Sequence, residues 1–207
     1  MIVYFVRHGE SQASAADIFQ KDDDPLSERG KEQVEILSEK LKSFSIGSIF
    51  SSPLIRAKES AEIVSKNLGK PFEIWNELTE TRNPSEIMGK PMDDAEVRKV
   101  RALIKENYHK GNWKYSDEET FEELRKRGKE AIENLLKKDE EEPVLCISHA
   151  GIIKMILSLM IFPDSLTAPL YWNFKYHLAS EYTGITTCKY SESRGWWVIT
   201  WNDTTHL

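Results

Sequence analysis

The chain opens with an apolar run from Ile2 to Val6 that stops abruptly at Arg7, His8 and Gly9. Five consecutive aliphatic or aromatic residues predict a strand that is buried on both faces, as in a parallel sheet covered by helices. Ligands bind such sheets outside the carboxyl ends of the strands, so this position suits a binding site. On their own, Arg7 and His8 are explained equally well as solvated residues at the end of a strand.

The rest of the chain alternates short apolar runs with amphipathic segments. Strands are predicted at residues 48–51, 72–75 and 143–147, and helices at residues 27–44, 53–68, 120–136 and 152–160. This alternation predicts an α/β fold, here a three-layer α/β/α sandwich around a mostly parallel central sheet. Residues 184–190 and 196–201 alternate apolar with polar side chains and predict antiparallel strands, so the sheet is expected to end in an antiparallel edge strand. The aromatic stretch at residues 170–182 is predicted to be irregular.

All 207 residues fit a single α/β domain, but residues 81–117 interrupt the alternation of strands and helices. Pro84 and Pro91 mark a loop there, and Asp93 or Asp94 begins a helix with one apolar and one basic face. We interpret residues 81–117 as an inserted loop and helix that cover the site as a lid. A basic helix face that is simply solvated is the alternative interpretation.

The composition argues against several classes of protein. A net charge of −6 disfavours a general nucleic-acid-binding protein, which usually carries a basic face. The longest apolar stretch, Ile152 to Phe162, is too short to span a bilayer, so no membrane association is expected. Cys146 and Cys188 lie in apolar surroundings without metal-ligand spacing and are expected to be buried free thiols. With no targeting segment evident at its start, the chain is expected to be cytoplasmic.

Polar side chains recur where the predicted strands end. Arg7 and His8 follow the first strand, and the next three are followed by Arg56, Glu80 and His149. Because the carboxyl ends of parallel strands lie at one edge of a sheet, these side chains are expected to share one crevice. Two guanidinium groups and the N-termini of two helices favour an anion there, and arginine binds phosphate oxygens in a bidentate manner. Such a concentration of positive charge in an acidic chain predicts a phosphate site.

The two histidines supply the chemistry that a phosphate site alone lacks. Imidazole is a competent nucleophile toward phosphorus when one ring nitrogen is deprotonated and the other is held by a hydrogen bond. His8, which directly follows a strand, is the better placed of the two, although His149 could also serve. The other histidine and the two arginines would stabilise charge on the transferring phosphoryl group. Glu80 could protonate the leaving oxygen, since a neighbouring phosphate disfavours ionisation of a carboxyl group, and Glu77 and Glu86 are alternatives for this role.

At these residues the chain resembles the histidine phosphatase superfamily, also called the phosphoglycerate mutase-like family. The motifs that carry the resemblance are residues 7–11 (RHGES), 23–30 (DDPLSERG), 52–57 (SPLIRA), 78–80 (LTE) and 148–151 (SHAG). The resemblance implies a phosphoglycerate mutase-like fold, a phosphorylated His8, Glu80 as proton donor, and a reaction that needs no cofactor and no metal. It also implies a phosphate pocket formed by Arg7, Arg56, His149, Gly9 and Ala150.

The chain departs from this family where the substrate is expected to bind. Many members have asparagine where this chain has Ser14, and the paired arginines of cofactor-dependent mutases are not recognisable after Glu80. We therefore predict a phosphatase of the acid or broad-specificity type that acts on a small phosphorylated metabolite, with Glu10, Ser14 and Arg82 as substrate contacts. The alternatives are a phosphoglycerate mutase, an inactive phosphate-binding member, and a metal hydrolase that uses the two histidines and Glu80. The oligomeric state is left open, and a homodimer is compatible with the sequence.

Overall fold

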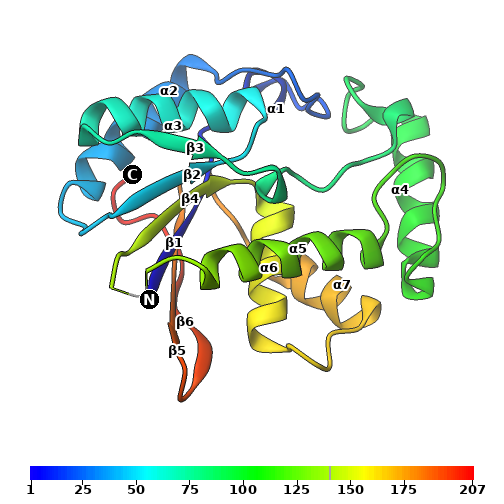
Figure 1. The fold of residues 1–207 in the computed structure, drawn as a ribbon. Coiled ribbons are helices and arrows are strands. Elements are labelled where there is room, and N and C mark those ends of the chain that lie inside the picture. The colour runs from blue at the N-terminus through cyan, green and yellow to red at the C-terminus, as the bar shows by residue number, and fades with distance from the viewer. Residues whose placement is uncertain (140) are drawn as a thin grey trace.

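The computed structural model describes residues 1–139 and 141–207, with a six-stranded sheet at its centre (Figure 1). The strands are β1 (Ile2–Arg7), β2 (Ser48–Ser51), β3 (Phe72–Ile74), β4 (Val144–Ser148), β5 (Ile185–Ser191) and β6 (Gly195–Asp203), in the spatial order β3-β2-β4-β1-β5-β6. The first four strands run parallel, whereas β5 is antiparallel to β1 and β6 is antiparallel to β5. The predicted mostly parallel sheet with an antiparallel edge is confirmed.

Helices cover both faces of this sheet. They are α1 (Gln12–Ala15), α2 (Glu28–Leu41), α3 (Ile55–Leu68), α4 (Ala95–Asn107), α5 (Phe121–Leu136), α6 (Ala150–Ile161) and α7 (Ala168–His177), with 3-10 turns at Asn76–Leu78, Ser85–Ile87 and Tyr108–Lys110. α2 and α3 lie on one face and α5 and α6 on the other, so the sheet is the middle of three layers (Figure 1). In the part of the chain that the structure describes, no helix has both the length and the apolar content needed to cross a membrane.

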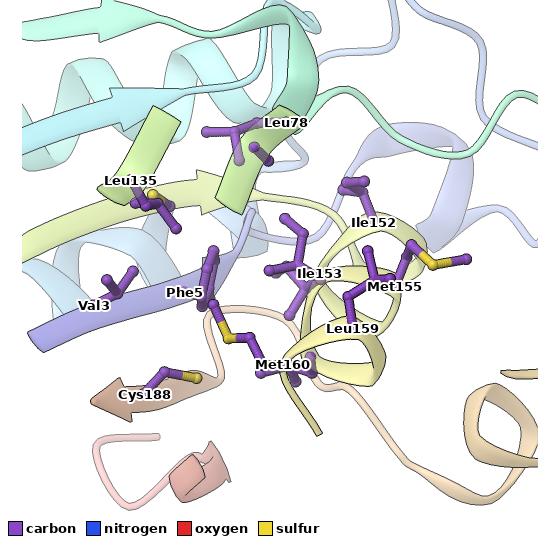
Figure 2. Close-up of a cluster of buried hydrophobic side chains, with 14 of the residues drawn as sticks. Val3, Phe5, Leu78, Leu135, Ile152, Ile153, Met155, Leu159, Met160 and Cys188 are labelled. Carbon is purple, nitrogen blue, oxygen red and sulfur yellow. The ribbon is translucent and has the colours of Figure 1, made fainter. Parts of the chain in front are cut away.

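Two apolar cores join the layers, one on each face of the sheet. Val6 of β1 belongs to the core beneath α2 and α3, whereas its neighbour Phe5 points to the other core. Figure 2 shows Phe5 beside Ile153 of α6 in that second core. Because both faces of the central strands are buried, these strands are continuous apolar runs in the sequence. Cys146 and Cys188 are free and buried, as predicted.

Side-chain caps define where several helices begin. The hydroxyl oxygen of Ser27 accepts a hydrogen bond from the backbone N–H of the third residue of α2, and Thr120 forms a capping box at the start of α5. α3 begins at Ile55, two residues later than predicted, because Leu54 keeps extended backbone angles (φ −69°, ψ 140°). The prediction that Pro53 is the first residue of this helix is therefore wrong.

The aromatic stretch that was predicted to be irregular contains a helix, so that prediction is also wrong. α7 begins after Thr167, whose side chain accepts a hydrogen bond from the backbone N–H of Leu170 (3.4 Å). Its aromatic residues point in several directions: Tyr171 is fully buried, while the ring of Trp172 lies 4.9 Å from the ring of Tyr176. Since the apolar residues do not form one stripe, the sequence lacks the periodicity of an amphipathic helix.

Residues 81–117 lie outside the three layers, with α4 at one side of the molecule (Figure 1). Val97 of α4 packs with Ile87 in a small apolar cluster, and Phe19 from the loop after β1 lies against it. The backbone N–H of Phe19 donates a hydrogen bond to the carbonyl oxygen of Lys90 (2.9 Å). The loop after β1 and the inserted residues are therefore one connected unit. That this unit acts as a lid stays a prediction.

Candidate active site

Segments far apart in the sequence meet at the carboxyl edge of the parallel strands and line a cavity of about 980 Å³. Arg7 ends β1, and Arg56, Glu80 and Ala150 follow β2, β3 and β4 respectively; all four residues line the cavity. They come together because parallel strands present their carboxyl ends at one edge of the sheet. Arg7, Arg56 and Glu80 of the expected crevice therefore line one cavity, whereas His8 and His149 are buried and are not among its lining residues.

Two of the three residues predicted to contact the substrate, Ser14 and Arg82, also line this cavity. The hydroxyl oxygen of Ser14 accepts a hydrogen bond from Nε2 of Gln20 (2.6 Å), another lining residue. Nε of Arg82 donates to the backbone carbonyl of Asp117 (2.7 Å), which leaves the outer nitrogens of its guanidinium group for other contacts. Both side chains are therefore placed where a substrate could reach them.

Glu10 and Gly9 are not among the residues that line the cavity. The Glu10 carboxylate accepts a hydrogen bond from the Ser27 hydroxyl (2.8 Å) and so attaches the loop after β1 to the start of α2. Gly9 packs against the backbone of Gly30, and its N–H donates to Oγ of Ser60 (3.2 Å). These contacts support the loop that carries His8, and the roles of Gly9 toward phosphate and of Glu10 toward the substrate stay predictions.

His8 is almost completely buried, and its ring has a defined tautomer. Nδ1 lies 2.6 Å from the carbonyl oxygen of Gly9, and because a carbonyl only accepts, Nδ1 carries the proton and Nε2 carries the lone pair. Burial lowers the pKa of His8 well below its usual value, and the positive charges of Arg56 and Arg7 lower it further. The ring is therefore neutral at neutral pH, with a nucleophilic nitrogen.

His149 lies next to His8, with the two ring centroids 4.9 Å apart. Its Nε2 is 2.8 Å from the hydroxyl oxygen of Ser52, and its Nδ1 is buried without a hydrogen-bond partner among the described residues. Burial lowers the pKa of His149 well below its usual value, and the proximity of His8 and the positive charges of Arg56 and Arg7 add to this effect. The contact of Ser52 with His149 could not be found from the sequence, because the two residues lie 97 positions apart.

Two guanidinium groups flank the histidines. Arg56 is buried, and its Nη1 donates to the carbonyl oxygen of Lys21 (2.8 Å). Arg7 donates to the carbonyl oxygen of Ser180, and its Cζ lies 3.7 Å from the centre of the Tyr182 ring. Burial lowers the pKa of Arg56, but an arginine remains charged at neutral pH, so both groups can hold an oxyanion. In the described ranges, no three His, Cys, Asp or Glu side chains are grouped so as to hold a metal ion.

The Glu80 carboxylate lies at the N-terminus of α6. It accepts hydrogen bonds from the backbone N–H groups of Gly151 (3.1 Å), Ile152 (3.2 Å) and Thr81 (2.7 Å). Helix N-termini attract carboxylates because their first N–H groups have no partner within the helix. This arrangement holds Glu80 in the wall of the cavity.

The alternatives to Glu80 as the proton donor are placed less favourably. Neither Glu77 nor Glu86 is among the lining residues of the cavity. The Glu86 carboxylate accepts a hydrogen bond from the Ser116 hydroxyl (2.7 Å) within the inserted residues. Of the three candidate carboxylates, only Glu80 faces the cavity.

Several residues that line this cavity are not predicted from the sequence, among them Lys154 of α6 and Lys175 of α7. Lys154 carries a signal in the sequence, since it interrupts an otherwise apolar helix shortly after His149. Lys175 and Tyr182 belong to the aromatic stretch that is predicted to be irregular; α7 brings Lys175 to the site, and the segment that follows α7 brings Tyr182.

The fold and the site together define a class: α/β proteins with two buried histidines and two arginines at the carboxyl edge of a mostly parallel sheet. The model of the histidine phosphatase superfamily (branch 1) matches residues 3–204 of this chain. The chain therefore belongs to the histidine phosphatase superfamily, as the motifs predicted.

Relatives in this family include proteins named as mutases and as phosphatases. The probable phosphoglycerate mutase GpmB of Salmonella arizonae is 28% identical over 221 residues, covering 99% of this chain and 94% of that protein. The adenosylcobalamin/alpha-ribazole phosphatase of Escherichia coli (strain K12) is 27% identical over 184 residues, covering 84% of this chain and 85% of that protein. The solved structure of YhfR from Bacillus stearothermophilus has the same fold, with a TM-score of 0.83 at 24% identity, and the match covers 99% of this chain and 98% of that one.

Proposed function

We propose that the chain is a phosphomonoesterase that hydrolyses a small phosphorylated metabolite through a phosphohistidine on His8. The observation that carries this proposal is the state of the His8 ring. The Gly9 carbonyl holds the proton on Nδ1, and burial with two adjacent arginines lowers the pKa of His8, so Nε2 keeps its lone pair. A neutral imidazole between guanidinium groups is suited to attack a phosphorus atom that those groups hold.

The reaction has two steps. In the first, Nε2 of His8 forms a bond to phosphorus while the bond from phosphorus to the ester oxygen breaks, and protonated Glu80 gives its proton to that oxygen. An alcohol leaves. In the second, water attacks the phosphohistidine, the Glu80 carboxylate accepts a proton from the water, and the N–P bond breaks. Inorganic phosphate leaves, and His8 and Glu80 return to the states in which they began the reaction.

The other residues of the site stabilise the phosphoryl group during both steps. Arg7 and Arg56 bind its oxygens, and fixed positive charges stabilise the charge that develops on them. His149, held through Nε2 by Ser52, presents its unpartnered Nδ1 as a further donor. The cavity of about 980 Å³ has the size of a site for a small metabolite.

A mutase is the second candidate, because a relative that matches nearly the whole chain is a probable phosphoglycerate mutase. Both reactions begin with the same phosphohistidine and differ in what accepts the phosphoryl group. A mutase returns it to a hydroxyl of the bound substrate, whereas a phosphatase gives it to water. We favour the phosphatase because the chain lacks recognisable paired arginines after Glu80.

The experiment is to incubate the protein with a phosphomonoester, quench it rapidly in alkali, and locate the phosphoryl group by mass spectrometry. We expect a phosphate on His8, release of inorganic phosphate, and loss of both in His8→Ala. His109→Ala, which removes an exposed histidine of the inserted residues, is the matched control and should retain activity. Full activity of His8→Ala would overturn the mechanism, and formation of an isomer without release of phosphate would indicate the mutase.

A further inference from the structure

The cavity carries more positive charge than a single phosphoryl group requires. Beyond Arg7 and Arg56, it is lined by Lys154 of α6, Lys175 of α7 and Arg101 of α4. These three cations come from three different helices, one of which belongs to the inserted residues. Their convergence on one cavity therefore depends on the tertiary fold and is not a property of one helix face.

The two lysines lie side by side. Nζ of Lys154 donates a hydrogen bond to the backbone carbonyl of Lys175 (3.2 Å), in the last turn of α7. Burial lowers the pKa of Lys154, and the positive charges of Lys175 and Arg7 lower it further. Burial also lowers the pKa of Lys175, an effect that Glu80 opposes and to which Arg101 adds. The charges thus form a continuous row from Arg7 through the lysines to Arg101.

The charge of Glu80 acts on the two lysines of this row, but no acidic side chain of the described residues forms an ion pair within 4.0 Å with them or with Arg101. Two of the four acids that line the cavity have other partners: Glu80 the N-terminus of α6, and Glu119 a guanidinium nitrogen of Arg127 (2.6 Å). The adjacent charges of Lys154 and Lys175, which are both half-buried, are unfavourable, and an anion placed between them removes that cost, whereas Arg101 is exposed.

A structural role accounts for only part of the row. Lys154 stabilises the C-terminus of α7, where carbonyl groups lack partners, and many helices end on such a lysine. That role does not explain the side chain of Lys175, which lines the cavity. Nor does it explain Arg101, whose Cζ lies 5.8 Å from the ring of Phe19 at the connection between the insertion and the loop after β1.

We propose that Lys154, Lys175 and Arg101 form a second anion subsite, which binds a carboxylate or a second phosphate of the substrate while Arg7 and Arg56 hold the phosphoryl group that is transferred. The substrate is then a phosphomonoester with a second anionic group at its other end. This inference rests on the proposed function of His8 and goes further by naming the class of substrate. It also gives the inserted helix α4 a direct part in recognition.

The test compares two substrates of nearly the same shape. Glycerol 3-phosphate and 3-phosphoglycerate differ in a hydroxymethyl group against a carboxylate, so the ratio of their kcat/KM values reports the second anion. We expect 3-phosphoglycerate to be preferred by about tenfold or more, the usual contribution of hydrogen bonds between charged groups. Lys175→Met, Lys154→Met and Arg101→Met should each reduce this ratio, and Lys175→Arg should restore part of it.

Arg98→Met is the matched control, because Arg98 is an exposed arginine of α4 that does not line the cavity. The ratio of the two kcat/KM values in this variant should equal that of the unchanged protein. A second pair, 1,3-propanediol bisphosphate against propyl phosphate, shows whether the subsite prefers phosphate to carboxylate. Equal kcat/KM values within both pairs would overturn the subsite and leave the proposed function standing.

If no substrate releases phosphate, the proposed function fails, and the subsite is tested by binding alone. Calorimetry of the unchanged protein and of Lys175→Met with the same compounds measures the preference without turnover. The subsite is supported if the compounds with two anionic groups bind more tightly and Lys175→Met abolishes this preference. Equal binding of both members of each pair overturns it.

Discussion

Oε2 of Glu80 lies 3.1 Å from the backbone nitrogen of Gly151, the second residue of α6. A Cβ atom on Gly151 would overlap Oε1 of the same carboxylate, so the glycine is needed for this contact. The proposed proton donor and the motif that carries His149 therefore depend on each other, although they are far apart in the sequence. A side chain at position 151 should therefore impair the proposed proton donor.

Gly151→Ala should displace the Glu80 carboxylate and weaken protonation of the leaving group. We expect kcat for an alkyl phosphate to fall by about tenfold or more, since general acid catalysis is worth about a hundredfold or more. 4-Nitrophenyl phosphate, whose leaving group departs without a proton, should be affected much less. The measurement is phosphate release from both substrates.

Glu80→Gln provides the reference for this prediction, because it should show the same dependence on the leaving group. Gly151→Ala added to Glu80→Gln should then cause little further loss, as residues that act together are not additive. An equal loss on both substrates would indicate that Gly151 serves only the fold.

Arg127 of α5 holds the segment that leads to Glu80, and we predict that it is a positioning residue. Its guanidinium group donates to the backbone carbonyls of Glu77 (3.0 Å) and Thr79, and it pairs with Glu119 (2.6 Å). Arg127→Lys keeps the charge but cannot span these acceptors. We expect kcat for an alkyl phosphate to fall about tenfold, a smaller loss on 4-nitrophenyl phosphate, and little change in KM.

Arg125→Lys is the control for Arg127, since Arg125 lies on the same helix and pairs with Glu122 (3.3 Å), one turn away on that helix. It should behave like the unchanged protein on both substrates. If Arg127→Lys lowered the two activities equally, the positioning role would be excluded, even if the protein were less stable.

Much of the fold could be predicted because its strands and helices carry local signals. β1 and β4 are apolar up to their last residue, since both faces of the central strands are buried, and α5 begins with a capping box at Thr120. α7 was missed because its aromatic residues contact several different elements and give no helical period. Local patterns therefore predict elements well only where one face of the element meets one core.

The site could be predicted only in part, for a related reason. The residues at strand ends, such as His8 and Glu80, could be placed because the edge of a parallel sheet is a known location. The partners of these residues could not, since Ser52 reaches His149 across a sequence separation of 97 residues. Glu10 is the opposite case. Its motif predicts a contact with the substrate, and in the structure its carboxylate accepts a hydrogen bond from the Ser27 hydroxyl.

The buried histidines make stability depend on pH. Burial lowers the pKa of His8 and of His149 well below the usual value in the folded protein, whereas the unfolded chain protonates both near pH 6.5. Below that pH the unfolded state binds more protons, so the free energy of unfolding should fall by up to about 1.4 kcal/mol per pH unit for each histidine. Urea unfolding between about pH 7 and about pH 5 measures this, above the range in which carboxylates titrate.

His8→Asn should reduce this slope by up to about 1.4 kcal/mol per pH unit, because one of the titrating groups is removed. His109→Asn, at an exposed position, should leave the slope unchanged. An unchanged slope in His8→Asn would show that His8 is protonated as easily in the folded protein as in the unfolded chain.

Gly30 of α2 should tolerate no side chain, although alanine normally stabilises a helix. A Cβ there would overlap the backbone carbonyl oxygen of Glu10, which cannot move without displacing the loop after β1. We expect Gly30→Ala to cost about 1–3 kcal/mol and to lower the Tm. Gly128→Ala in α5 is the matched control and should cost less, because its Cβ would meet Cδ1 of Leu159 (2.8 Å) and Cγ of Met155 (3.0 Å), side-chain atoms that can shift. An equal loss of unfolding free energy in the two variants would mean that the loop after β1 moves aside as easily as the side chains of Leu159 and Met155.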